Sequence, residues 1–191
     1  MEALFGIMTA FGLSASAGLN AYIPLLVVGV IAHYTDWITL NPPYDTLANP
    51  WVLIVVGMLL IVEMLADKIP AVNHINDILQ TGIRPAAGAI IFAASAHVLT
   101  NVHPVIAIIC GLLVAGSVHV VKSAAIRPAV TATTGGTANI PVSIAEDVLA
   151  TGVSFLSIVT PVLMIVILVI AIALIIWAFW RRAHRKRQPV S

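Results

Sequence analysis

Charged residues are scarce in this chain of 191 residues: only 9% are Asp, Glu, Lys or Arg, whereas 60% are hydrophobic. A soluble globular domain has roughly 25% charged and about 45–50% apolar residues, so a soluble fold of this composition would expose large apolar patches. A nucleic-acid-binding domain would carry a basic surface, but the formal net charge is only +1. The mean hydropathy of +1.06 therefore indicates an integral membrane protein.

Cysteine is nearly absent, since Cys110 is the single one and lies in an apolar run. No intramolecular disulfide can form, which excludes a secreted disulfide scaffold. We expect no signal peptide, because the chain starts with Glu2 where a basic region would stand. His33, His97 and His103 have no recognised ligand spacing, so we expect no metal and no cofactor.

Six apolar segments approach the length of about 20 residues that a helix needs to cross the hydrocarbon. They lie within residues 3–32 and at about 51–66, 85–99, 105–121, 140–158 and 162–180. The first is too long for a simple span, and Gly18, Asn20 and Pro24 predict a break or kink in it. We therefore expect one all-α transmembrane bundle at 1–180, with about six spans and broken or re-entrant segments, and a basic tail at 181–191.

The basic residues indicate the orientation of these spans. All nine Lys and Arg residues fall in the connections 67–84 and 122–138 or in the tail, and the opposite connections hold none. With the acids included, this inner side sums to +9 − 6 = +3 and the outer side to −2. The positive-inside rule then predicts that both termini and these two connections are cytoplasmic.

Part of the sequence repeats. Residues 50–68 and 104–122 align without a gap at an offset of 54, with five identities in 19 positions. Each unit predicts a helix that begins at a proline and ends at Lys68 or Lys122. We interpret the two units as an internal direct repeat.

The few charges gather near the inner ends of the expected helices. Glu63 and Asp67 are four residues apart and share a helix face. A charge at the centre of a membrane helix costs roughly 2.5–3.5 kcal/mol, so we expect Glu146 or Asp147 to face the basic side chains. A structural ion-pair lock, a substrate or proton site and snorkelling to the interface all remain open as interpretations.

The two inner connections differ in pattern. In the first, the apolar residues from Pro70 to Gln80 recur at helical spacing on one face and the polar residues on another, which predicts a short amphipathic helix. The second is rich in hydroxyls and contains Gly135 and Gly136, which predicts either an ordinary polar loop up to Asn139 or a turn whose consecutive backbone N–H groups bind an anion.

Several motifs together resemble one bacterial membrane family, catalogued as domain of unknown function 4126. They are the runs Gly18–Pro24, Glu63–Pro70, Ile83–Gly88, His119–Ser123, Gly135–Asn139 and Ser143–Asp147. The resemblance covers roughly residues 5–160. It implies a small polytopic protein of the bacterial inner membrane, and it implies no activity.

These features favour a small transporter or flippase with a cytoplasm-facing polar cavity for an anionic or phosphate-bearing substrate. The candidate substrate-binding residues are Lys68, Arg84, Lys122, Arg127 and Asn139. The candidate proton-coupling or ion-pair residues are Glu63, Asp67, His119, Glu146 and Asp147. The expected partners are membrane lipids, a small anionic or lipid substrate and a second copy of the chain, with no nucleic acid.

Two other functions stay open. One is an intramembrane enzyme that acts on a lipid head group, with His119 or a carboxylate as acid or base. No nucleophile–base pair and no HExxH motif stand out, so we assign no catalytic residue. The other is a non-catalytic assembly or scaffold subunit.

Overall fold

The computed structural model describes residues 2–99 and 102–161 and the single positions 163, 166, 169, 170, 173 and 177. The side chains at 2–3, 70–74 and 97–99 lie outside this description. Most of the expected span at 162–180, the basic tail and the side chain of His97 therefore fall outside the described residues.

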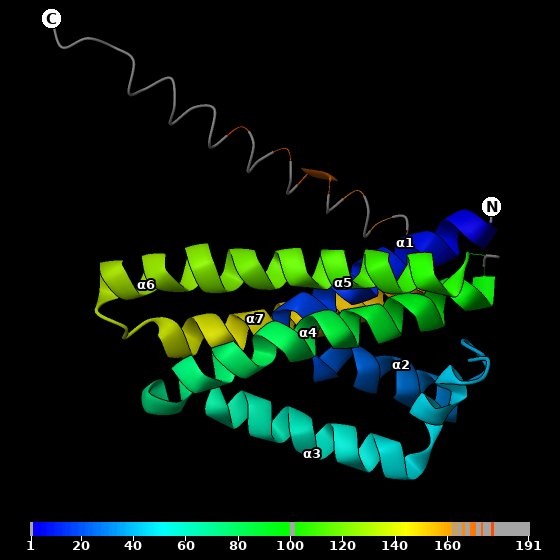
Figure 1. Ribbon diagram of the computed structural model, residues 1–191, viewed down its shortest axis with the longest axis horizontal. Coiled ribbons are helices and arrows are strands. Elements are labelled where there is room, and N and C mark those ends of the chain that lie inside the picture. The colour runs from blue at the N-terminus through cyan, green and yellow to red at the C-terminus, as the bar shows by residue number, and fades with distance from the viewer. Residues whose placement is uncertain are drawn as a thin grey trace, which may run out of the picture.

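All regular elements of the described residues are helical, which confirms the all-α fold class. In chain order they are α1 (Glu2–Leu19), α2 (Tyr22–Tyr34), the 3-10 segment η1 (Tyr44–Ala48), α3 (Pro50–Ala66), α4 (Pro70–Leu99), α5 (Pro104–Val121), the π-helical segment η2 (Lys122–Ile126), α6 (Arg127–Thr134) and α7 (Asn139–Val159). The long helices run along the long axis of the bundle (Figure 1). We call the end where α3 meets α4 and α6 meets α7 the left end, and the end where α4 meets α5 the right end, as they lie in Figure 1.

The first apolar segment forms a helical hairpin. α1 ends at Leu19 and α2 begins at Tyr22, with two residues between them, so the expected break is confirmed. Asn20 stabilises the reversal, because its Oδ1 accepts hydrogen bonds from the backbone N–H groups of Tyr22 (3.1 Å) and Ile23 (3.2 Å). Pro24 lies in the first turn of α2, where a helix needs no N–H donor.

This hairpin places the start of α1 at the right end of the bundle (Figure 1). Near that end the Thr9 hydroxyl donates a hydrogen bond to the carbonyl of Ser157, close to the end of α7 (2.8 Å). The expectation that the N-terminus shares an end with the connections 67–84 and 122–138 is therefore wrong. A kinked span would have crossed the bundle, whereas a hairpin returns the chain to its starting end.

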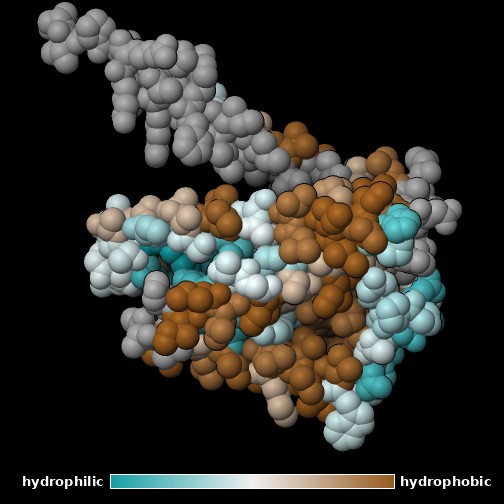
Figure 2. Space-filling view, viewed as in Figure 1, coloured by the Kyte–Doolittle hydropathy of each residue, from teal (hydrophilic) through white to brown (hydrophobic). Residues whose placement is uncertain are grey.

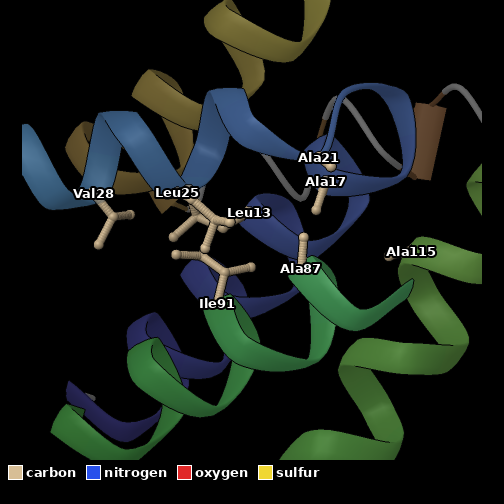
Figure 3. Close-up of a cluster of buried hydrophobic side chains, with 8 residues drawn as sticks. All are labelled: Leu13, Ala17, Ala21, Leu25, Val28, Ala87, Ile91 and Ala115. Atoms are coloured by element: carbon tan, nitrogen blue, oxygen red, sulfur yellow. The ribbon is translucent and has the colours of Figure 1, made fainter. Parts of the chain in front are cut away.

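Small side chains let α1, α4 and α5 pack closely. The main apolar cluster consists of Leu13, Ala17, Ala21, Leu25, Val28, Ala87, Ile91 and Ala115 (Figure 3). Gly88 and Gly111 face each other beside it, and a Cβ on Gly111 would lie only 2.7 Å from the Cα of Ala89. Close packing of this kind drives helix association inside a bilayer, where the hydrophobic effect does not act between helices.

The helix α4 is amphipathic with its polar face inward. It runs without interruption from Pro70 through Pro85 to Leu99. The helix therefore begins 15 residues before the expected segment at 85–99, and the predicted amphipathic connection forms the first half of α4. Here Asn76, Gln80 and Arg84 are buried, whereas Ile75, Ile78 and Leu79 are exposed. An apolar outer face suits contact with lipid.

The connection at 122–138 is mostly helical, where the sequence predicted a polar loop. The segments η2 and α6 continue α5 to Thr134. The chain then turns at Gly135 (φ 62°) and Gly136 (φ 89°), a left-handed conformation that favours glycine. No re-entrant loop lies within this described connection.

Three of the described helical stretches are long and apolar enough to cross a membrane, at Ile75–Ala96, Pro104–Thr134 and Asn139–Val159. Shorter apolar helices cover Leu4–Leu19, Tyr22–Tyr34 and Pro50–Ala66. Large apolar side chains are exposed along the outside, and Figure 2 shows brown apolar residues over much of the visible face. These features agree with a membrane protein.

The two proposed repeat units share their start and their direction. Asn49 and His103 each accept a hydrogen bond from the second residue of the following helix, and each helix begins with proline. Both helices run from the right end to the left end (Figure 1). The internal repeat itself stays a prediction.

The glycine contact predicts the effect of one added methyl group. Gly111→Ala would push Cβ against the backbone of α4, and overpacking of this kind costs about 1–3 kcal/mol. We expect a lower midpoint of thermal unfolding in detergent. Gly57→Ala on α3 is the control, because a Cβ there meets no atom within 4 Å. Equal midpoints for the two variants would contradict the close packing.

Candidate functional site

Charged side chains converge in the left half of the bundle, at the end of α3, on α4, on α5–α6 and on α7. We call this set the charged cluster: Glu63, Asp67, Lys68, Asp77, Arg84, Lys122, Arg127, Glu146 and Asp147. Figure 2 shows hydrophilic residues in a hollow between apolar ridges in this half of the molecule. Arg84 and Lys122 are among the largest fully buried side chains, with 0% and 1% exposure.

Asp67 is the centre of the charged cluster. Its Oδ2 lies 2.8 Å from Arg127 Nη2 and 3.7 Å from both Arg84 Nη2 and Lys122 Nζ. Its Oδ1 accepts a hydrogen bond from Asn76 Nδ2 (2.7 Å). One carboxylate from the end of α3 therefore connects α4, α5–η2 and α6.

The environment of Asp67 favours its charged form. The residue follows the last residue of α3. Burial raises the pKa of its carboxyl, but Lys122, Arg127 and Arg84 together lower that pKa below its ordinary value of 3.8. The three cations thus outweigh the desolvation of the carboxylate.

Arg84 forms the most deeply buried pair. Its Nη2 and Nε donate to Glu63 Oε1 at 2.8 Å and 3.2 Å, and both side chains are at most 1% exposed. Its Nη1 lies 3.2 Å from His119 Nδ1. A guanidinium has no acceptor, so His119 Nδ1 must be the acceptor and the ring proton must sit on Nε2.

This tautomer directs the rest of a hydrogen-bond chain. His119 Nε2 lies 3.2 Å from the hydroxyl of Thr81, and that hydroxyl donates to the carbonyl of Asp77 (2.9 Å). His119 is therefore neutral and orients Arg84. The coupling role that the sequence suggested for His119 stays a prediction.

Lys122 ties the charged cluster to the tip of the α1–α2 hairpin. Its Nζ lies 2.8 Å from Glu146 Oε2 and donates to the backbone carbonyl of Leu19 (2.9 Å). The last carbonyls of a helix have no partner within it, so Leu19 at the end of α1 offers a free acceptor. Lys122 is thus placed by α7 and by the hairpin together.

Asp147 contacts the same hairpin. Asn20 Nδ2 donates to its Oδ1 (3.0 Å), and Lys68 Nζ lies 3.4 Å from its Oδ2. The Lys68 side chain is 27% exposed, which makes this pair the most open of the cluster's lysine contacts. Asn20 therefore both caps α2 and anchors α7.

Arg127 lies at the rim of the charged cluster. It contacts Asp77 Oδ1 and Oδ2 at 2.9 Å and 3.1 Å and Glu146 Oε2 at 3.4 Å. It follows η2, whose wider helical turn changes which face of the α5–α6 helix points inward. Its fork geometry suits carboxylate or phosphate groups.

The cluster contains more carboxylates than cations. Its Lys and Arg side chains carry +4 and its Asp and Glu side chains −5, which sum to −1. Four buried side-chain atoms among the described residues make no hydrogen bond: Glu63 Oε2, Gln80 Oε1, Ser143 Oγ and Glu146 Oε1. No group of three or more His, Cys, Asp or Glu in the described part of the chain is arranged as a metal site.

The structure brings together all the predicted site residues except Asn139. Asn139 lies at the start of α7 and exchanges hydrogen bonds with Thr131 (3.1 Å and 3.3 Å), away from the charged cluster. Sequence reasoning missed Asp77, Asn20 and Asn76 as members of the site. The polar stripe through Asn76, Gln80 and Arg84 at a spacing of four was the available signal for the first half of α4.

Fold and site together define a small helical membrane bundle built around a buried network of ion pairs. The family model described as Domain of unknown function (DUF4126) matches residues 7–181, and the chain belongs to this family. The chain itself matches no curated protein and no solved structure.

The position of Asp67 predicts a large loss of stability for Asp67→Asn. The asparagine loses the ion pair with Arg127 and the attraction of Arg84 and Lys122, and a hydrogen bond to a charged group contributes about 1.5–3 kcal/mol. We expect this loss in the free energy of unfolding in detergent at neutral pH. Asp45→Asn, at an exposed position in η1, is the control and should unfold as the wild type does.

The same prediction has a pH signature. Because the folded pKa of Asp67 lies below its unfolded value, its stabilisation is present above the unfolded pKa and is lost as the pH falls through the folded value. The difference between the wild type and Asp67→Asn should therefore narrow in acid. A difference that is small at neutral pH would contradict the central role of Asp67.

Proposed function

We propose that the protein is a small transporter or flippase that moves an anionic, phosphate-bearing substrate through the charged cluster. The observation that carries this proposal is the set of four basic side chains that pair with carboxylates in one half of the bundle, two of them fully buried. Ionisable side chains are costly inside a membrane and commonly mark substrate or ion pathways.

The ion pairs of the cluster are suited to exchange. Lys122 and Arg127 both contact Asp67 and Glu146, so each cation has at least two carboxylate partners. A phosphate oxygen has the same charge and acceptor chemistry as these carboxylates. A substrate can therefore replace one carboxylate contact without leaving a buried cation unpaired.

Two irregular helical segments border the cluster and support a conformational cycle. The π-helical η2 begins at Lys122, and π-helical turns occur frequently at functional sites. The α1–α2 reversal at Asn20 contacts Lys122 and Asp147. Interrupted helices that end at the binding site are typical of transporters that alternate between two sides.

The same proposal includes location and coupling. With the positive-inside rule, the left end faces the cytoplasm of a bacterial inner membrane, and the hairpin then puts the start of α1 at the other face. The surplus carboxylate of the cluster is the group that takes up a proton as the substrate binds or leaves.

Proteoliposomes test transport with two probes, radiolabelled inorganic phosphate and fluorescent phosphatidylglycerol. The double variant Asp77→Asn with Arg127→Gln removes one rim pair without leaving an unpaired charge of that pair. We expect flux of the transported probe to fall by at least about tenfold, which is the loss of 1.4 kcal/mol of binding. Asp45→Asn is the control, and the unfolding midpoint shows that the variant folds. Flux that is absent for both probes in the wild type, or unchanged in the double variant, would contradict the proposal.

Glu146 tests the coupling. Its Oε2 binds Lys122 and its Oε1 is buried without a hydrogen bond. Glu146→Gln should make flux independent of an imposed pH gradient, because the side chain can no longer exchange a proton. Flux that follows the gradient as in the wild type would remove Glu146 from the coupling.

A second candidate is a non-catalytic scaffold subunit, since each of the four cations already has a carboxylate partner. A permanent ion-pair lock would give the same contacts. It predicts that the double variant at Asp77 and Arg127 keeps full function in cells while a partner protein still copurifies.

A further inference from the structure

An apolar groove runs between α2, α3 and α7 and borders the charged cluster at Asp147. It is lined by Ile23 of α2, Leu60 and Met64 of α3, and Val148, Thr151 and Gly152 of α7, and it encloses about 490 Å³. The helix α3 lies along the edge of the bundle (Figure 1). Gly152 contributes no side chain, and the Thr151 hydroxyl is satisfied by the carbonyl of Asp147 (2.8 Å). The groove wall is therefore apolar along α7.

Asp147 closes the groove at its polar end. Its carboxylate also lines the groove and pairs with Lys68 Nζ at 3.4 Å. That ammonium donates to the carbonyl of Met64 (3.0 Å) as well, which accounts for two of its three N–H groups among the described residues. One donor of Lys68 and the remaining lone pairs of Asp147 are thus available at the groove mouth.

The chemistry at this mouth is a positive and a negative group side by side, next to an apolar channel. A primary-amine phospholipid has the complementary arrangement, with an anionic phosphate, a cationic ammonium and an acyl chain. A purely anionic lipid would meet the repulsion of Asp147, and a quaternary ammonium has no N–H to donate to it. Both features favour the primary amine.

We infer that the α2–α3–α7 groove binds an aminophospholipid of the surrounding bilayer. One acyl chain fills the groove, the phosphate accepts a hydrogen bond from Lys68, and the ammonium donates to Asp147. This site shares Lys68 and Asp147 with the charged cluster but involves none of Arg84, Lys122 and Arg127, so lipid binding here does not depend on transport through those three cations.

Native mass spectrometry of the purified full chain tests this site with three lipids of identical acyl chains: phosphatidylethanolamine, phosphatidylcholine and phosphatidylglycerol. We expect phosphatidylethanolamine to bind most tightly. Asp147→Asn should remove its advantage over phosphatidylcholine, because the carboxylate that recognises the ammonium is lost. Equal binding of all three lipids, or the tightest binding for phosphatidylglycerol, would overturn the assignment.

Gly152→Leu tests whether the groove is the site. A Cβ at Gly152 meets no atom within 4 Å, so the fold accepts a side chain there, and the leucine would occupy the groove. Because the leucine side chain would take the space of the acyl chain, we expect lipid binding to weaken by about tenfold, which corresponds to 1.4 kcal/mol.

Gly57→Leu on α3 is the matched control, because its Cβ is equally unobstructed and Gly57 does not line the groove. It should bind lipid as the wild type does. Wild-type binding by Gly152→Leu would show that the lipid sits elsewhere. Because lipid binding is measured without flux, a failed transport assay leaves this result intact.

Discussion

The fold depends on keeping one carboxylate, Asp67, charged inside an apolar bundle. Three cations from α4, α5–η2 and α6 surround it, and each cation has a further carboxylate partner of its own. Those partners are Glu63 for Arg84, Glu146 for Lys122 and Asp77 for Arg127. Buried charges are tolerated only when such pairing is complete, so the left halves of these helices have to converge on one point.

The two halves of the bundle are consequently held by different interactions. On the right, α1, α4 and α5 approach closely through alanines and glycines, where a single methyl group has no room. On the left, long charged side chains connect the helices by hydrogen bonds and ion pairs. Close van der Waals packing resists displacement of the helices, whereas a cation with alternative carboxylate partners can exchange one ion pair for another. Any rearrangement of the bundle is therefore expected on the left, among the ion pairs that have alternative partners.

The sequence was sufficient to locate the charged cluster. In a chain with 9% charged residues, every inward charge needs a partner, so Glu63, Arg84, Lys122 and Asp147 had to meet if the helices cross side by side. Hydropathy could not reveal that α4 and α5–α6 extend beyond their apolar windows, since a helix with a polar inner face has low mean hydropathy. Asp77 was missed because the polar stripe that contains it is equally typical of a helix face exposed to solvent.

The reversal at Asn20 was beyond sequence reasoning for a different cause. Gly18, Asn20 and Pro24 signal a break, but the angle of a break depends on what the following helix packs against. In this protein Asn20 binds Asp147, and Lys122 binds the Leu19 carbonyl, so the turn is held by partners more than 100 residues away in the chain. Tertiary contacts with α5 and α7 therefore decide between a kink and a hairpin.

The cations of the charged cluster differ in solvent exposure, from Arg84 at 0% to Lys68 at 27%. Arg84–Glu63 and Lys122–Glu146 both measure 2.8 Å and are nearly inaccessible, whereas Lys68–Asp147 measures 3.4 Å and has the most exposed cation. The free-energy cost of separating an ion pair to admit a third group rises with the burial of the pair. This cost is smallest for Lys68–Asp147, whose cation is the most exposed. This pair also closes the apolar groove between α3 and α7. Under the proposed function, a substrate with an apolar tail would reach the network from the bilayer through this edge, since exchange of partners costs least there.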